Sequence, residues 1–221
     1  MTKSVALVIG ASRGLGFSLA IELAKLGYHV VCVARTVGGL EALDDEIKEV
    51  GGTATLAPLD ITDKKAIENL CHKIFLRWKK IDVLILSAIY AAPLTPVEHI
   101  DQKDLQKSIE TNLTSTQVII SMTQPLLKFA KKGLAVFFSD HHYKKKFFGA
   151  YDATKNAQIS LALNWKKENS NNSIEVLVLE PEAMATASRA RFHPGEEKDL
   201  LKSPEKEAQR LVQIINQASV S

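Results

Sequence analysis

The sequence is poor in the features that mark secreted and membrane proteins. Its two cysteines, Cys32 and Cys71, are too few among 221 residues for a disulfide framework, so we expect a reducing, cytoplasmic location. No apolar run reaches the roughly 18 residues of a membrane span. The first apolar stretch is interrupted by Ser12, Arg13 and Gly14, unlike a signal peptide. The net charge of +3 does not by itself indicate a partner.

The composition is that of an ordinary globular protein, with 46% hydrophobic and 24% charged residues and no repeat, low-complexity stretch or composition break. Six β-branched or apolar runs predict buried strands at 4–9, 28–34, 53–60, 81–88, 134–139 and 173–180. Helical spacing predicts helices over 17–27, 39–52, 63–78, 101–130, 150–169 and 203–217. This alternation indicates βαβ units, so we predict one α/β domain over residues 1–221, with a parallel sheet covered on both faces. Pro125 is expected to kink the fourth helix.

Three glycines lie in the turn between the first predicted strand and helix: Gly10, Gly14 and Gly16 in IGASRGLG. Gly10 permits a tight exit from the strand, and Gly14 and Gly16 let the backbone approach a phosphate. The free N–H groups and positive end of the helix would stabilise a pyrophosphate there. The spacing is Gly-x-x-x-Gly-x-Gly, and no Lys-Ser/Thr pair follows as in a P-loop. The turn therefore predicts a dinucleotide site rather than a structural role alone.

This spacing resembles the short-chain dehydrogenase/reductase family, and the resemblance covers essentially the whole chain. Family positions recur in order at Asp60, Asn112, Tyr151, Lys155, Pro181 and Thr186. Each motif is weak alone, but their order on the expected elements is specific. The resemblance implies a Rossmann-type doubly wound sheet of about six strands in the order 3-2-1-4-5-6. It also implies that the cofactor is contacted by further residues of the same loops: Ser12, Arg13, Leu15, Arg35, Ile61, Ser87 and Ala88.

The resemblance implies hydride transfer between a nicotinamide and a carbonyl carbon, with a tyrosine transferring the proton. Tyr151 and Lys155 are one helical turn apart and share a helix face. A charge ~4 Å away at an effective dielectric of ~20 contributes about 4 kcal/mol, which lowers a tyrosine pKa by about three units before desolvation opposes it. By resemblance, Lys155 also holds the nicotinamide ribose and Asn112 supports a proton-relaying water. The structural alternatives are a half-buried aromatic at Tyr151 and a helix-kink or capping residue at Asn112.

The charges beside the second strand predict the cofactor. An NAD enzyme would place an acidic residue at the end of that strand to bind the ribose 2′-hydroxyl. The sequence there is ARTVGG, with Arg35 and no carboxylate, and Arg13 lies in the glycine turn itself. Two guanidinium groups suit a 2′-phosphate, although both could be ordinary surface arginines. We predict that NADP(H) is preferred over NAD(H).

Some positions depart from the family pattern. Residues 86–89 are Leu-Ser-Ala-Ile where the family has Asn-Asn-Ala-Gly, so either the loop moves outward at Ile89 or the cofactor site is partly obstructed. Glu182 replaces a glycine beside the expected nicotinamide pocket. The family's seventh strand has no counterpart, which argues against a tetramer. A homodimer through the helices near 103–130 and 151–168 is still expected.

The family's catalytic serine has two possible positions in this sequence. Alignment on the fifth strand places Asp140 there, whereas counting back from Tyr151 favours Ser139. Ser139 could orient a substrate carbonyl, but an ionised Asp140 would repel the developing alkoxide. We include Ser139 among the predicted catalytic residues, and the alternative stays open.

The segment HHYKKKFF separates the fifth strand from the next helix and should border the active site. His141 and His142 have no accompanying Cys or acidic ligand set, so no metal site is expected. Lys144, Lys145 and Lys146 are either solvated side chains or attract an anionic substrate. The other lysine pairs form no stripe with interleaved aromatics, so nucleic-acid binding is not expected.

These observations favour an NADP(H)-dependent oxidoreductase that interconverts a carbonyl and an alcohol of a small molecule. Tyr151 would be the acid/base, with Lys155, Asn112 and Ser139. The segment 182–203 would form the substrate lid. The alternative is a cofactor-binding protein without turnover, acting as a redox sensor or interaction scaffold, because this fold serves many activities. The natural substrate and the reaction direction do not follow from the sequence.

Overall fold

The computed structural model describes residues 3–140, 145–170 and 174–220. At its centre is a sheet whose six strands pair in parallel throughout. Across the sheet the strands are β3 (Thr53–Pro58), β2 (His29–Ala34), β1 (Val5–Ile9), β4 (Val83–Leu86), β5 (Gly133–Phe138) and β6 (Ile174–Leu179). This order, 3-2-1-4-5-6, confirms the predicted α/β, Rossmann-type doubly wound sheet.

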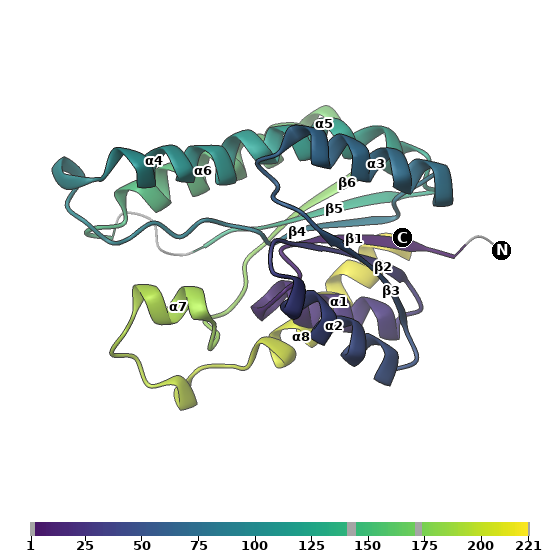
Figure 1. Cartoon of the computed structure of the whole chain (residues 1–221), viewed down its shortest axis with the longest axis horizontal. Coiled ribbons are helices and arrows are strands. Elements are labelled where there is room, and N and C mark those ends of the chain that lie inside the picture. The colour runs from purple at the N-terminus through teal and green to yellow at the C-terminus, as the bar shows by residue number, and fades with distance from the viewer. Residues whose placement is uncertain (1–2, 141–144, 171–173, 221) are drawn as a thin grey trace.

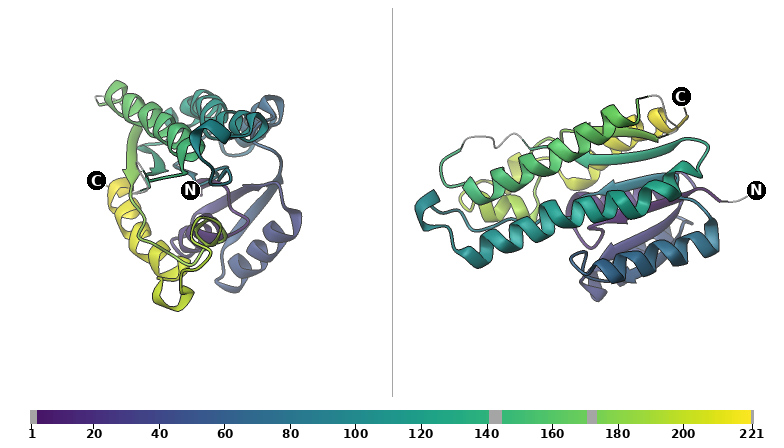
Figure 2. Two further views of the ribbon diagram at one scale, coloured as in Figure 1. Left: turned by 90° about the vertical axis from the view of Figure 1, so that its left-hand side faces the viewer. Right: turned by 90° about the horizontal axis from the view of Figure 1, so that it is seen from above.

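Helices cover both faces of the sheet, as Figures 1 and 2 show. On one face lie α3 (Lys64–Trp78), α4 (Gln102–Ser108), α5 (Ser115–Lys128) and α6 (Gly149–Glu168). On the other face lie α1 (Gly14–Lys25), α2 (Val37–Glu49) and α8 (Pro204–Val220). In the part of the chain that the structure describes, no helix combines the length and apolarity that crossing a membrane would need.

Side-chain alternation along the strands gives each face its own core. In β1, Val5, Leu7 and Ile9 belong to the apolar cluster under α3, α5 and α6. Ala6 and Val8 belong to the cluster under α1, α2 and α8. Since both faces of a parallel sheet are covered, its strands are apolar at consecutive positions. This is the continuous apolar pattern from which the strands were predicted.

The fourth predicted helix is interrupted around Asn112, for which the sequence left a helix-kink role open. After α4 the chain forms a π-helix over Ile109–Thr114 and then returns to α geometry in α5, which contains Pro125. The Asn112 side chain lies in this π-helix and bonds the backbone of Tyr90 through both of its polar atoms, at 2.7 and 3.0 Å. A π-helical turn contains one residue more than an α-helical turn, and here it carries the buried Asn112 side chain with its long-range hydrogen bonds. The kink that we expected in this helix was at Pro125.

The sheet order reverses between β1 and β4, and this reversal opens a crevice at the carboxyl ends of those strands. The glycine turn follows β1, the 86–89 segment follows β4, and the loop toward α6 follows β5. A short helix, α7 (Ala187–Phe192), lies beyond the carboxyl ends of the strands (Figure 1). Helix α7 and the 3₁₀ turn Lys198–Leu200 both fall within the predicted lid, where no helix was expected.

Candidate active site

A cavity of about 650 Å³ lies at the crevice. Its lining includes sixteen predicted site residues: Gly10, Ser12, Arg13, Gly14, Leu15, Gly16, Arg35, Asp60, Ile61, Ser87, Ala88, Ser139, Tyr151, Lys155, Pro181 and Thr186. Asn112 is fully buried and does not belong to that lining. The lining also contains Thr111, Arg189 and Phe192, which sequence reasoning did not assign. Segments from the whole length of the chain therefore converge on one site.

The glycine turn is packed too closely for side chains. A Cβ at Gly10 would lie 2.6 Å from the backbone nitrogen of Ala88, and one at Gly16 would lie 2.3 Å from the Gly10 oxygen and from Ser87 Oγ. Gly14 has a φ of +59° and starts α1 at the cavity, and a Cβ there would lie 3.4 Å from the Thr186 side chain. The first N–H groups of a helix have no partner within the helix, so a helix that starts at the cavity provides a cradle that fits a pyrophosphate.

An ion pair lies where the cavity meets the residues that follow β2 and β3. Arg35 Nη1 lies 3.6 Å from Asp60 Oδ2, and both side chains are substantially exposed. Burial raises the pKa of Asp60, but hydrogen bonds from the Thr62 N–H and hydroxyl, together with Arg35, lower it further, so the net shift is downward. Arg13 is exposed and lines the same cavity. Two guanidinium groups therefore border this end, where the resemblance places the adenosine.

Tyr151 lies two residues into α6, and its hydroxyl donates to Asp140 Oδ2 at 2.8 Å. Ser139 Oγ instead donates to the Leu179 oxygen of β6 at 3.3 Å, and the Ser139 N–H bonds the same oxygen. Because Ser139 still pairs with β6, its side chain is held there and the next residue faces the tyrosine. The structure thus places Asp140, not Ser139, at the Tyr151 hydroxyl, although both line the cavity.

Lys155 is buried, and its ammonium donates to Gln158 Oε1 at 2.8 Å. Burial lowers the pKa of Lys155 to about 8, although Asp140 acts in the opposite direction. Gln158 Nε2 in turn donates to Thr116 Oγ1 at 3.0 Å, and that hydroxyl donates to the Asn112 carbonyl at 2.8 Å. A buried chain of polar groups therefore connects Lys155 to the π-helix through Gln158 and Thr116, which were not among the predicted site residues.

Asn112 has a positioning role in this structure. Besides its two bonds to Tyr90, its Nδ2 donates to Thr154 Oγ1 at 3.0 Å. Thr154 follows Tyr151 and precedes Lys155 in α6, so Asn112 ties the segment after β4 to the helix that carries both predicted catalytic groups. These contacts match the helix-kink reading of Asn112, and its main-chain carbonyl begins the polar chain to Lys155.

The 182–203 segment, predicted to be the substrate lid, covers Tyr151 with an aromatic side chain. The Phe192 ring of α7 lies 4.8 Å from that of Tyr151 and 5.0 Å from that of Phe148, measured between centroids. Thr186 caps α7 by accepting the Arg189 N–H at 3.2 Å. The Arg189 guanidinium is held by two bonds of 2.7 and 2.6 Å to Glu196, within the same lid. Apolar contact of Phe192 therefore holds the 182–203 segment against Tyr151.

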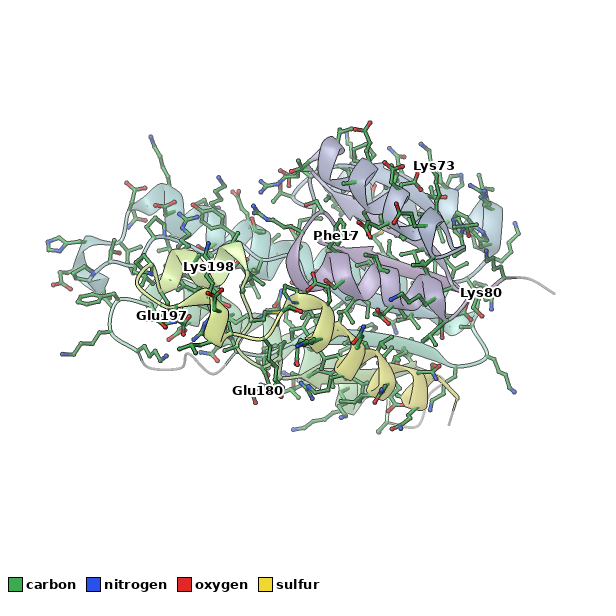
Figure 3. The ribbon with its side chains drawn as sticks, turned by 90° about the horizontal axis from the view of Figure 1, so that it is seen from below. Phe17, Lys73, Lys80, Glu180, Glu197 and Lys198 are labelled. Carbon is green, nitrogen blue, oxygen red and sulfur yellow. The ribbon has the colours of Figure 1, made fainter. Side chains whose placement is uncertain are left out.

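An ion pair joins the two ends of the 182–203 segment, and its first residue, Glu182, also contacts α8. Glu182 pairs with Lys202 at 2.7 Å. Glu182 stands where the family has a glycine, and its carboxylate is therefore held between the two ends of the 182–203 segment. Glu207 is fully buried, accepts the Glu182 N–H at 3.0 Å and pairs with Arg210. Figure 3 shows this segment from below, with Glu180 at its start and Glu197 and Lys198 in the turn between α7 and α8. The cavity stays open beside Glu182, which lines it.

Ile89 packs with the apolar cluster around Phe148 and Tyr151 and also lines the cavity, which extends past it from the glycine turn to Tyr151. Among the described residues, no group of three or more His, Cys, Asp or Glu side chains is arranged to hold a metal ion. His141, His142 and Lys144 lie outside the described residues. Lys145 is exposed and lines the cavity, whereas Lys146 is exposed and does not.

Comparison with known proteins gives consistent matches. The model of the short chain dehydrogenase family matches residues 4–197. The NADP-dependent 3-hydroxy acid dehydrogenase YdfG of Salmonella typhi is 26% identical over 198 residues, which are 88% of this chain and 79% of that protein. The crystal structure of a metagenomic short-chain oxidoreductase in complex with NADP is 25% identical, with a TM-score of 0.83 over 99% of this chain and 92% of that one.

Some relatives are much longer than the region they share with this chain. The fatty acyl-CoA reductase of Acinetobacter baylyi is 32% identical over 126 residues, 56% of this chain but 43% of the reductase. The match to glycine betaine reductase ATRR of Emericella nidulans spans 15% of that protein. The extent of the family match, with the parallel sheet and the Tyr151–Lys155 pair at the cavity, shows that the chain belongs to the short-chain dehydrogenase family.

Proposed function

We propose that the protein is an NADP(H)-dependent oxidoreductase that interconverts a carbonyl and an alcohol of a small molecule, with Tyr151 as the acid/base. One observation carries the proposal. A single cavity joins the glycine turn at the start of α1 to the Tyr151 hydroxyl and the Lys155 ammonium. A dinucleotide with its pyrophosphate at the turn would extend toward Tyr151, where the reacting carbon would lie. When bound, the cofactor would supply or accept the hydride.

The preference for NADP(H) rests on charge. Arg13 and Arg35 border the end of the cavity where the adenosine would lie, and the residue after β2 is Arg35 rather than an acid. A 2′-phosphate there would accept charge-assisted hydrogen bonds from guanidinium groups. Asp60, already paired with Arg35, would remain beside the adenine. NAD(H), with a hydroxyl in place of the phosphate, would lose these bonds.

In this mechanism each group of the chain has a defined task. Tyr151 gives its hydroxyl proton to the carbonyl oxygen during reduction and takes it back during oxidation. The Lys155 ammonium stabilises the tyrosinate left behind and would bind the nicotinamide ribose. The buried chain through Gln158 and Thr116 orients the ammonium. Phe192 and the rest of the lid, residues 182–203, exclude water from the reacting carbon.

Lys145 supports the proposal that an anionic group of the substrate binds at the cavity. If so, Lys145→Gln should raise the apparent KM for anionic substrates about tenfold and leave neutral ones unchanged, since a charge-assisted hydrogen bond is lost. Lys146→Gln is the matched control, because Lys146 is also exposed but does not line the cavity. Equal effects of the two variants, or of one variant on both substrate classes, would remove Lys145 from the site.

Further proposals concern the whole protein. We propose a single domain in the cytoplasm and a homodimer through the helices near 103–130 and 151–168. Light scattering coupled to gel filtration tests the dimer. A monomeric mass at micromolar concentration would contradict it.

The test of the proposed function is a fluorescence titration of the purified protein with NADPH and with NADH. We expect micromolar binding of NADPH, weaker binding of NADH, and loss of both in Gly14→Asp. Aspartate tolerates a positive φ better than most residues, and its charge would repel the pyrophosphate. Gly195→Asp is the control, because Gly195 has no atom within 4 Å of its Cβ position and does not line the cavity. Absence of binding by the wild type would favour the scaffold alternative.

A further inference from the structure

The lysine that would serve Tyr151 is held by an uncharged side chain. The Lys155 ammonium donates to Gln158 Oε1 at 2.8 Å, one turn further along α6. Lys155 lines the cavity and Gln158 does not, and both are buried, which by itself favours the neutral form of a lysine. An ammonium has three protons to donate. Gln158 therefore accepts one of them and leaves two for the ribose hydroxyls that the proposed function places in the cavity.

The amide of Gln158 can present only its oxygen to Lys155. Gln158 Nε2 donates to Thr116 Oγ1 at 3.0 Å, and the Thr116 hydroxyl donates its single proton to the Asn112 carbonyl at 2.8 Å. With that proton committed, the Thr116 oxygen accepts from Gln158 and cannot donate to it. If the amide were reversed, its oxygen would face an acceptor and its NH2 group would face an ammonium. The main-chain carbonyl in the π-helix thus sets the direction of every hydrogen bond up to Lys155.

Ionisable groups act on Lys155 from the cavity side. Asp140, which follows β5, raises the pKa of Lys155 through its charge, and Tyr151 lies one turn earlier on α6. Charged groups on the surrounding elements contact residues other than Lys155: Asp104 and Lys107 on α4, Glu110 on the π-helix, Glu175 on β6 and Arg189 on α7. Away from the cavity, compensation of the ammonium therefore comes from the Gln158 oxygen.

We propose that Gln158 is a positioning residue that holds the Lys155 ammonium in its charged form, with Thr116 fixing the direction of the Gln158 amide. The proposal rests on the proposed function for the tasks of Tyr151 and Lys155, and it adds what sets the pH range over which Lys155 performs its own. Every hydrogen bond in the chain donates away from Lys155, and the chain ends at a carbonyl that has no proton to give. The chain therefore holds the ammonium and does not resupply its proton.

Two substitutions of Gln158 should act on Lys155 in opposite directions. Gln158→Glu keeps the shape and adds a negative charge in contact with the ammonium, so it should raise the pKa of Lys155 by about one unit or more. Gln158→Met keeps the length and removes the acceptor, so it should lower that pKa by about one unit. A side chain that only filled space would behave differently, because loosened packing admits water and raises the pKa toward the ordinary lysine value of about 10.4.

Substitutions of Thr116 test the fixed direction of the amide. In Thr116→Val, Gln158 Nε2 loses its acceptor and the amide can turn, so the pKa of Lys155 should fall, but by less than in Gln158→Met. Thr116→Ser keeps the hydroxyl and should retain the wild-type pKa. Asn156→Asp is the matched control for Gln158→Glu, because Asn156 is exposed on the same helix and the added charge is screened by solvent. It should move the pKa less than half as far as Gln158→Glu.

NMR titration of the protein labelled with ¹³C at lysine Cε measures the pKa of Lys155, whose signal is the one missing from Lys155→Met. An equal pKa in the wild type and both Gln158 variants, or a change in the same direction in both, would overturn the proposal. Thermal unfolding establishes which variants are folded. If Gln158→Met does not fold, Thr116→Val supplies the expected fall, and an unaltered or raised pKa there would overturn the proposal in its place.

The titration needs neither NADPH nor a substrate, so failure of the proposed function is separately visible as absence of NADPH binding or of turnover. With any substrate that the wild type reduces, the upper pH limit of NADPH oxidation should move with the measured pKa of Lys155 in each variant. A limit that stays fixed while the pKa moves would overturn the positioning role of Gln158.

Discussion

The cavity has two halves that are built in different ways. The half next to β1 and β2 is built on backbone, because Gly10 and Gly16 pack too closely against their neighbours for a side chain and Gly14 has a positive φ. The half next to β5 and β6 is made of side chains, among which Asp140 contacts Tyr151 and Phe192 covers it. The first half can hold the same dinucleotide in many proteins. The second half can differ from one relative to the next, because altering a side chain there leaves the turn intact.

The largest effect that would sharpen this comparison is expected at Lys155. Lys155→Met should lower kcat/KM about 100-fold or more, because the tyrosinate loses its stabilising charge. In the wild type, activity should fall as the pH rises through about 8, where the buried ammonium loses its proton. NADPH oxidation across pH 6–10 measures both effects.

Lys167→Met is the matched control for Lys155→Met, since Lys167 is exposed on the same helix. If Lys155→Met kept most of the activity, the proposed role of Lys155 in the half of the cavity next to β5 and β6 would be wrong.

The next largest effect is expected on the anchoring of the lid. Glu207→Gln should lower the free energy of unfolding by about 2 kcal/mol, because the buried side chain loses its charge-assisted hydrogen bonds from Arg210. Burial raises the pKa of Glu207, but Arg210 and the Glu182 N–H lower it further. Its stabilisation is therefore present above the ordinary glutamate pKa of about 4.3 and lost as the pH falls through the lower folded value.

Urea unfolding measures the loss in Glu207→Gln. The control is Glu205→Gln on the exposed side of the same helix, which should change the stability by less than about 0.5 kcal/mol. Equal effects of the two substitutions would mean that the ion pairs do not hold the lid.

A smaller effect is expected in the backbone-built half, where we propose that Arg35 helps to bind the 2′-phosphate of NADP(H). Arg35→Ala should raise the Kd for NADPH about tenfold and hardly alter that for NADH, because only the former has a 2′-phosphate. Fluorescence titration measures both constants, and Arg77→Ala on α3 controls for the loss of a positive charge. A parallel weakening of both nucleotides would place Arg35 outside the phosphate site.

The smallest effect is expected far from the cavity. His29 is buried between the hydroxyls of Thr53 and Thr55, and burial lowers its pKa, helped by Arg77 and Lys3. Because the folded state holds the proton less tightly than the unfolded chain, stability should decline as the pH falls below about 6.5. His29→Gln should flatten this decline, and urea unfolding from pH 5 to 8 measures it.

His72→Gln, on the exposed face of α3, is the control for His29→Gln. An unaltered pH dependence in His29→Gln would assign the decline to other groups.

The backbone-built half could be predicted from sequence because its signals are local. Continuous apolar runs gave the strands, and glycines at fixed spacing gave the turn. The choice between Ser139 and Asp140 could not be made, because it depends on where strand pairing with β6 ends. The π-helix at 109–114 depends on tertiary bonds from Asn112. Helix α7 is six residues of mixed character, stabilised by packing against the rest of the site.

The loop departures illustrate the same limit. Glu182 replaces a glycine beside the expected nicotinamide pocket, and its carboxylate pairs with Lys202 at the other end of the 182–203 segment. Gln158 and Thr116 carry no motif, yet they connect Lys155 to the π-helix. Thr116 and Lys202 lie far along the chain from the residues that they contact, so spacing alone could not reveal those contacts. Gln158 is one helical turn from Lys155 on α6, but it belongs to no motif. A polar residue on the buried face of α6 was the one available signal.

The most direct test of the account compares wild type and Tyr151→Phe side by side in NADPH oxidation. The substrates would be short aldehydes, ketones and 3-oxo acids. We predict turnover of at least one class by the wild type and a loss of about 100-fold or more in Tyr151→Phe, with the Kd for NADPH unaltered. Tight NADPH binding without turnover of any class, or equal rates for both proteins, would contradict the catalytic role of Tyr151.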